Sequence, residues 1–333
     1  MRSSRFALVF AFLLAGILAS PLFAATIGVF IPGALQGSPT YELLDAGVRK
    51  AAAEVPGTVV KTIEGGFNQA QWGEQIATLA ASGEYKWIVT SNPAMPEICT
   101  PVALAYPAQK FIILESWSKN PSFATLSYNH RELAFLHGAL AGLLTKSRKG
   151  AAVAGLVAGQ EYPDMNNAIL PGFKEGFQSI LPAGKVEFRV VGNWYDAGKG
   201  AELAKNLFDQ NVSVVLPIAG GAGQGVISAA KQAGKSVLWY DTDGYELEKG
   251  IIVGSGVIHQ DTASYHLVKK ALAGTLEYGK PQVVGVKEGY LDYLTSLTAY
   301  VSALPAAIRT PFEAIVSQFR SGKKTLAMPL PAN

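Results

Sequence analysis

Residues Val190 to Asp243 read VVGNWYDAGKGAELAKNLFDQNVSVVLPIAGGAGQGVISAAKQAGKSVLWYDTD, and this stretch decides the fold. Three apolar, β-rich runs alternate there with two helical runs, and each apolar run ends in a loop of aromatic, glycine or carboxylate residues. Ligands of open α/β sheets bind outside the carboxyl ends of the strands. We therefore expect these loops to hold a small molecule and the intervening runs to serve as scaffold.

The same alternation runs through the whole chain of 333 residues, of which 49% are hydrophobic and 16% charged. That composition is typical of folded domains rather than disordered chains. Hydrophobic spacing predicts strands at residues 26–31, 58–63, 87–90, 111–114, 151–157, 186–191, 212–218, 237–240 and 251–257, and helices at 41–54, 69–81, 133–144, 171–180, 201–210 and 226–233. Apolar strands alternating with helices predict an α/β fold with parallel sheets flanked by helices.

So many strands favour two similar lobes over one, with breaks in the pattern near residues 122–129 and 254–256. We predict a first α/β lobe from residues 26–127 plus about 255–275, and a second from 128–254 plus about 276–333. A third chain crossing is expected nearer the C-terminus. A cleft between two such lobes is a common place for a small-molecule site.

The first 25 residues predict a secretory signal peptide: a basic start, an apolar run over Ala7–Ala19 and small residues at Ala24 and Ala25. The alternative, a membrane anchor, is disfavoured because the run is too short to span a bilayer. No cysteine lies near the predicted cleavage site, so we expect no lipid attachment. Without Arg2 and Arg5 the chain has 26 basic and 25 acidic residues, a balance that indicates no nucleic-acid partner.

The loops after the predicted strands supply the candidate ligand contacts, which are Ser38, Tyr41, Asn92, Trp117, Asp164, Trp194, Tyr195, Gly221 and Asp241. Aromatic side chains there could stack on a flat ring, although each is also suited to simple packing. Ser38 is equally suited to cap the helix that Pro39 would begin. A carboxylate such as Asp241 can accept hydrogen bonds from vicinal hydroxyls.

Two further loop features have competing interpretations. Asp241 and Asp243 flank one residue, and we favour Asp241 as the contact, whereas Asp196 is better suited to cap the next helix. The run GGAGQG at residues 220–225 precedes a helix but matches neither phosphate-binding fingerprint. Close approach of its backbone to a neutral ligand is the better interpretation.

The sequence offers no arrangement typical of catalysis. It contains neither G-x-S-x-G nor H-E-x-x-H, and its histidines are His130, His137, His259 and His266. No acid or cysteine cluster completes a metal shell around them. The lone cysteine, Cys99, is expected to be a buried apolar residue. We therefore predict a binding protein with no catalytic residue, metal or cofactor.

Several segments resemble the basic membrane protein (Bmp) family of ABC-transporter solute-binding proteins: YPAQKFIIL at 106–114, ELAFLHGALAGLLTKSRKGAAVAGLVAG at 132–159, PGFKEGF at 171–177 and residues 193–243. The resemblance implies a two-lobed, type I periplasmic-binding fold that closes on a ligand, which is a purine nucleoside in the best-known members. It implies a first-lobe aromatic that stacks on the base, here Tyr41 or its neighbour, and an aspartate that holds the ribose, here Asp241.

Two departures from the family pattern concern the ligand itself. The family's D-K-S-F-N after the first strand is replaced by GSPTY at residues 37–41, which loses the acid. Its S-V-V-K reads Ser255 to Ile258 here, which loses the lysine beside His259. A Phe-Asn pair occurs at Phe67 and Asn68, but after the second strand, so we do not equate it with the family motif. A less hydroxylated or more apolar ring compound is therefore an alternative to a nucleoside.

These features predict a monomeric periplasmic solute-binding protein of an ABC importer. It would bind a small ring-containing solute, with a purine nucleoside or nucleobase as the first expectation, and deliver it to a permease in the inner membrane. One alternative is a sensor subunit that binds a sugar-like or heterocyclic signal and contacts a membrane receptor. Another is an enzyme on the same scaffold.

Overall fold

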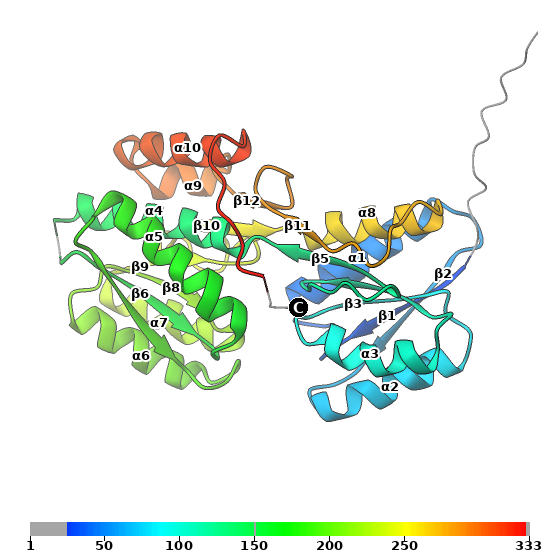
Figure 1. The fold of residues 1–333 in the computed structure, drawn as a ribbon. Coiled ribbons are helices and arrows are strands. Elements are labelled where there is room, and N and C mark those ends of the chain that lie inside the picture. Colours follow the sequence, from blue (N-terminus) through cyan, green and yellow to red (C-terminus); the bar gives the residue numbers. More distant parts are fainter. Residues whose placement is uncertain (1–24, 150, 331–333) are drawn as a thin grey trace, which may run out of the picture.

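Two six-stranded sheets, each covered by helices on both faces, make up the protein (Figure 1). The structure, a computed structural model, describes residues 25–149 and 151–330. The predicted signal peptide lies outside these residues except for Ala25. The layered α/β architecture confirms the fold class that the alternating pattern predicted.

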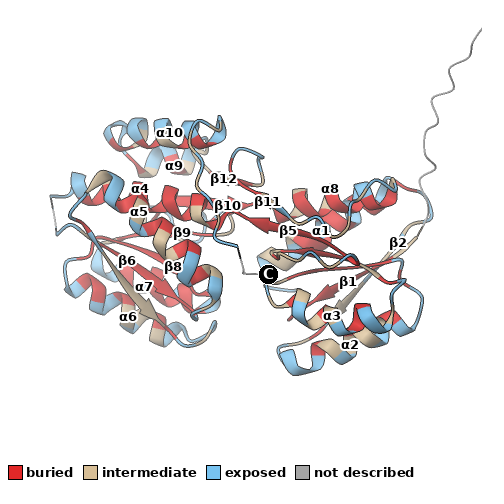
Figure 2. Cartoon of the chain, in the orientation of Figure 1, coloured by how far each residue is buried: buried red, intermediate tan, exposed pale blue. Residues whose placement is uncertain are grey.

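The first sheet consists entirely of parallel strands. Their order is β11 (Gln282–Val284), β5 (Phe123–Tyr128), β4 (Lys110–Leu114), β3 (Trp87–Ser91), β1 (Thr26–Ile31) and β2 (Val59–Glu64). The central strands are buried on both faces because helices cover both, and this explains their continuous apolar runs (Figure 2).

Four helices cover this sheet: α1 (Pro39–Ala53), α2 (Gln69–Ala81), α3 (Met95–Ala105) and α8 (Gln260–Leu272). In β1, Val29 belongs to the core that includes α1 and α8, whereas Phe30 belongs to the core beneath α2 and α3. Successive side chains of a strand point to opposite faces. Cys99 of α3 is fully buried in that second core, as the sequence predicted.

The second sheet is parallel except for its edge strand β12, which pairs antiparallel with β10. Its order is β12 (Leu291–Tyr293), β10 (Ile252–Ile258), β9 (Ser236–Trp239), β8 (Val214–Ile218), β6 (Val153–Ala158) and β7 (Lys185–Val190). The strands of the stretch that opened the sequence analysis therefore lie in one sheet.

The helices of the second lobe are α4 (His130–Ser147), α5 (Leu170–Ile180), α6 (Ala197–Asp209), α7 (Gly223–Ala233), α9 (Thr298–Ala303) and α10 (Ala306–Arg320). Figure 1 shows α4 and α5 on one side of the sheet and α6 and α7 on the other. A π-helical turn (Met165–Ile169) precedes α5. Asp196 caps α6 by accepting a hydrogen bond from the Lys199 amide, as predicted.

The chain passes between the lobes three times: between β5 and α4, between β10 and α8, and between β11 and β12. The buried carboxylate of Glu132, just after the first passage, accepts hydrogen bonds from the amides of Val286 in the third passage and Leu326 in the C-terminal segment. The side-chain amide of Asn129 also donates a hydrogen bond to the Leu326 carbonyl.

The first chain passage falls at the end of the predicted break at residues 122–129, whereas the second lies just after the predicted break at 254–256. Residues 122–129, expected to form a break, contain β5, whose Thr125 hydroxyl hydrogen-bonds the Ser118 carbonyl. Residues 254–256 lie inside β10 of the second sheet, so the chain leaves that lobe at His259. Strand β11 joins the first sheet, although residues 276–333 were expected in the second lobe.

The close contact between α1 and α8 depends on Gly47. A Cβ atom at this position would lie 2.1 Å from the Asp261 carbonyl oxygen. We expect Gly47→Ala to lower the free energy of unfolding by about 1–3 kcal/mol, because the helices must separate. Gly73→Ala is the matched control, since its Cβ would meet only Ile98 at 3.8 Å. Urea denaturation should show no loss for the control, and equal stability of the two variants would contradict the packing role.

Candidate functional site

Glu115 immediately follows β4 at the carboxyl end of the first sheet. Strands β3 and β4 pair with Ser91 opposite Leu114, so the Ser91 hydroxyl reaches Glu115 and donates to its Oε2 atom at 3.3 Å. The Ser91 hydroxyl in turn accepts a hydrogen bond of 2.8 Å from the side-chain amide of Gln260, the first residue of α8. A residue at the chain passage between the lobes therefore helps to orient a carboxylate at a strand end.

Asp241 follows β9 at the carboxyl end of the second sheet. Its carbonyl accepts a 2.9 Å hydrogen bond from the Ile258 amide at the end of β10. The buried Ser255 hydroxyl holds the loop after Asp241, because it donates to the Thr242 carbonyl at 2.8 Å and accepts from the Gly244 amide at 2.9 Å. Asp243 is exposed and accepts a hydrogen bond from the Tyr245 amide.

Glu115, Asp241 and Asp164 lie close enough together to interact electrostatically, and we call these three residues the carboxylate site. Burial raises the pKa of Glu115 to about 8, and the negative charges of Asp241 and then Asp164 add to the rise. Burial also raises the pKa of Asp241 to about 7. Both keep part of their surface accessible to solvent, as groups that can meet a ligand must.

Aromatic residues surround the carboxylate site. Burial, followed by the charges of Asp241, Glu115 and Asp164, raises the pKa of the Tyr162 hydroxyl. Burial lowers the pKa of His130, whose Nδ1 lies 3.2 Å from the Tyr240 hydroxyl, and so keeps this imidazole neutral at pH 7. These neighbours contribute hydrogen-bonding groups and ring surfaces but no positive charge.

On the first lobe, Tyr41 and Asn92 lie together beside Glu115. Burial raises the pKa of Tyr41 to about 12, opposed by a hydrogen bond to the Asn92 side chain, while the charge of Glu115 adds to the rise. Asn92 also accepts a hydrogen bond from the Ala94 amide. Ser38 is the N-cap residue of α1 and Pro39 follows it, as the capping alternative expected, but the Ser38 side chain makes no capping hydrogen bond.

On the second lobe, Trp194 packs over Gly159, and its indole donates to the Gln160 side chain at 3.0 Å. Its ring centroid lies 6.0 Å from that of Tyr162, which places it next to the carboxylate site. Tyr195 and Gly221 lie close to each other, and the Tyr195 side chain is 80% exposed. On the first lobe, the indole nitrogen of Trp117 is buried without a hydrogen-bond partner.

Sequence reasoning missed three residues of this region. The rule that located Asp241 also reaches Glu115, since both follow a buried strand, but only Trp117 was selected from that loop. Gln260 gave no local signal, because its partner Ser91 is 169 positions away. Phe67, set aside because it follows the second strand, is 85% exposed and lies beside Gly33 together with Tyr41.

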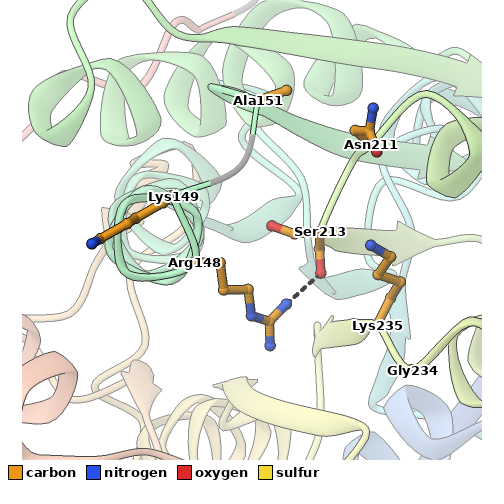
Figure 3. A pocket seen from close by; sticks show the side chains of 7 residues that line it. All are labelled: Arg148, Lys149, Ala151, Asn211, Ser213, Gly234 and Lys235. Carbon is orange, nitrogen blue, oxygen red and sulfur yellow. Dashed lines mark hydrogen bonds between the residues drawn. The ribbon is translucent and has the colours of Figure 1, made fainter.

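A pocket of about 450 Å³ lies at the opposite, amino end of the second sheet (Figure 3). Its residues include Arg148, Lys149, Asn211 and Lys235. The Arg148 guanidinium is engaged within the lobe, where it donates to the Ser213 carbonyl at 2.6 Å. Solutes of such sheets bind at the carboxyl ends, so we do not assign the solute to this pocket.

The sequence itself matches a known family over most of its length. The Bmp family model, described as ABC transporter substrate-binding protein PnrA-like, matches residues 24–303. This chain belongs to the Bmp family. Bmp proteins of this description are substrate-binding proteins of ABC transporters. Within the described residues of this Bmp protein, no helix is both long and apolar enough to cross a membrane.

Individual relatives agree with this membership. Basic membrane protein D of Borreliella burgdorferi is 32% identical over 166 residues, covering 49% of this chain and 47% of that protein. The ABC transporter nucleoside-binding protein BmpA of Lactococcus lactis is 30% identical over 155 residues, which cover 46% of this chain and 42% of that protein. The matched part thus spans just under half of each relative.

A solved structure shares the fold over nearly the whole chain. The ABC transporter solute-binding protein from Aeropyrum pernix has a TM-score of 0.74, covering 92% of this chain and 94% of that protein. At 21% identity, this likeness establishes the two-lobed fold and not the ligand.

The raised pKa values of Glu115 and Asp241 predict how stability depends on pH. Both groups are protonated more readily in the folded state, so their contribution is complete below about pH 4 and is lost as the pH rises through about 7 and 8. Each group contributes a slope of at most about 1.4 kcal/mol per pH unit. We expect Glu115→Gln to gain stability relative to wild type as the pH rises from 5 to 8.5.

The measurement is urea denaturation across that pH range, with Asp243→Asn as the control. Asp243 lies in the loop after Asp241, and asparagine can keep its hydrogen bond to the Tyr245 amide. The control should parallel wild type. A difference between Glu115→Gln and wild type that does not change with pH would contradict the raised pKa of Glu115.

Proposed function

We propose that this chain is the solute-binding component of an ABC importer. It acts in the periplasm as a monomer, binds a small ring-containing solute between its lobes and delivers that solute to a permease in the inner membrane. Purine nucleosides and nucleobases are the first solutes to test, because the Lactococcus lactis relative is named a nucleoside-binding protein.

The observation that carries this proposal is the proximity of Glu115 and Asp241 across the lobes. The Gln260 side chain donates to Ser91, which donates to Glu115. Two residues before Gln260, the Ile258 amide donates to the Asp241 carbonyl. The two carboxylates follow strands of different sheets, so the carboxyl ends of both sheets face one region. A solute held there would contact both lobes at once. Because it would interact with more groups when the lobes are close together, it would shift the population toward the closed form that a permease can recognise.

Exposed aromatic rings on both lobes support a ring-containing solute. Phe67 follows β2 in the first lobe and is 85% exposed, whereas Trp194 follows β7 in the second lobe and is 40% exposed. Phe67 lies by Tyr41 and Trp194 by Tyr162, and both tyrosines are affected by the charge of Glu115. Stacking a ring on such a side chain is worth about 1–3 kcal/mol.

A thermal-shift screen of nucleosides, nucleobases, sugars and vitamins tests the proposal. A solute at one hundred times its Kd should stabilise the protein by about 2.7 kcal/mol. For the solute found, we expect Trp194→Ala and Phe67→Ala each to raise the Kd by roughly 5- to 150-fold through lost stacking, as measured by calorimetry.

Leu104→Ala serves as the control, because Leu104 is similarly exposed, at 75%, but lies on α3 away from these rings. Its Kd should equal that of wild type. Failure of every ring-containing solute to shift the melting temperature would refute the proposed solute class. Unchanged affinity in both Trp194→Ala and Asp241→Ala would place the solute elsewhere.

A further inference from the structure

We propose that the site between the lobes selects a solute whose ring carries a positive charge, held between Glu115 of the first lobe and Asp241 of the second. This inference rests on the proposed function, because it assumes that a ring-containing solute lies between the lobes. It narrows that solute class from neutral heterocycles to cationic ones, such as N-alkylated or amino-substituted aromatic rings.

The first argument is that no cationic side chain offsets the negative charge that the carboxylate site gains as it ionises. Each charged group that acts on Glu115 is another carboxylate, first Asp241 and then Asp164. Within the described part of the chain, no lysine or arginine is among the groups that shift the pKa of Glu115 or Asp241. Like charges brought together with little water are costly, and an opposite charge placed between them removes that cost.

The groups that face the carboxylates from the neighbouring elements do not supply this charge. They are Ser91 at the end of β3, Tyr41 of α1, Tyr128 of β5, Tyr162 after β6, His130 of α4 and Tyr240 after β9. The tyrosines and serine are neutral, and burial keeps His130 neutral. The residue whose amide bonds to Asp241 is Ile258, which is aliphatic and buried.

A second, independent observation is a set of unpaired polar atoms beside the carboxylates. Gln260 is fully buried, and its Oε1 atom has no hydrogen-bond partner. Its other side-chain atom, Nε2, donates to Ser91, which in turn donates to Glu115. The buried Tyr128 hydroxyl, affected by the charge of Glu115, is also unpaired. An unpaired buried acceptor is costly, so the amide oxygen favours a solute with N–H donors.

The residues around the carboxylates favour an organic cation over a metal ion. Among residues 25–149 and 151–330, no group of three acidic, histidine or cysteine side chains is placed to hold a metal. The carboxylates are instead accompanied by the exposed rings of Phe67 and Trp194. Aromatic faces attract cations, and a charge delocalised over a flat ring suits both the rings and the separated carboxylates.

Matched pairs of neutral and cationic rings test this inference by isothermal titration calorimetry on the protein with both lobes present. The probes are nicotinamide with 1-methylnicotinamide, and adenosine with 1-methyladenosine. We expect the cationic member of at least one pair to bind about tenfold tighter at pH 8. For 1-methylnicotinamide, whose charge is permanent, the affinity should rise from pH 5.5 to pH 8.5 as the carboxylates ionise.

Glu115→Gln and Asp241→Asn should each reduce the preference for the cation by about tenfold. Asparagine tolerates the positive φ of 75° at position 241, so this variant keeps the backbone. Asp243→Asn, a carboxylate outside the site in the same loop, should leave the preference unchanged. Thermal melting of each variant separates a loss of charge from a loss of fold.

The outcomes distinguish failure of the proposed cation preference from failure of the proposed function. Neutral rings that bind as tightly as their cationic partners, or bind more tightly as the pH falls, would overturn the inference and leave the proposed function standing. A cation preference that survives both Glu115→Gln and Asp241→Asn would also overturn it. If no ring of either charge binds, both proposals fail.

Discussion

The buried carboxylate of Glu132 is the contact on which the relation of the two lobes depends. It lies at the start of α4, just after the first passage of the chain, and binds the amides of Val286 in the third passage and Leu326 in the C-terminal segment. Burial raises the pKa of Glu132, while these amides oppose the rise. Segments that are distant in sequence are thus held at one point.

The strand ends that meet across the lobes carry backbone strain. Glu115 and Asp241 have φ angles of 53° and 75°, in the left-handed region that residues other than glycine rarely adopt. Each is fixed by neighbours: the Ser116 amide donates to Leu126, and the Asp241 carbonyl accepts from Ile258. Strained residues of this kind concentrate at functional sites because the surrounding structure must hold them there. The two residues with strained backbones, Glu115 and Asp241, are therefore also two of the three residues in the carboxylate site.

Helices and strands could be predicted from the sequence wherever apolar residues were regularly spaced. They were missed where prolines or polar residues interrupted that spacing. Helix α3 was missed because Pro96 and Pro101 lie within it, although Pro96 suits its first turn. Strand β5 was taken for a break because Thr125 and Ser127 interrupt its apolar residues. Both polar residues are buried, and the Thr125 hydroxyl finds its partner in the Ser118 carbonyl, a pairing that no local pattern reveals.

From the sequence, the candidate site could be predicted only as two separate sets of loop residues, one in each lobe. The rule that ligands meet strand ends selected Asp241 and Tyr41, and both lie near Glu115, since the charge of Glu115 acts on Tyr41 and that of Asp241 acts on Glu115. The rule could not indicate the sign of the charge that the assembled site would prefer. That property arises only when three carboxylates from separate loops converge and Ile258, rather than a cation, lies beside Asp241. The preference for the charge of the solute thus depends on loops from both sheets. No single loop sequence indicates that preference.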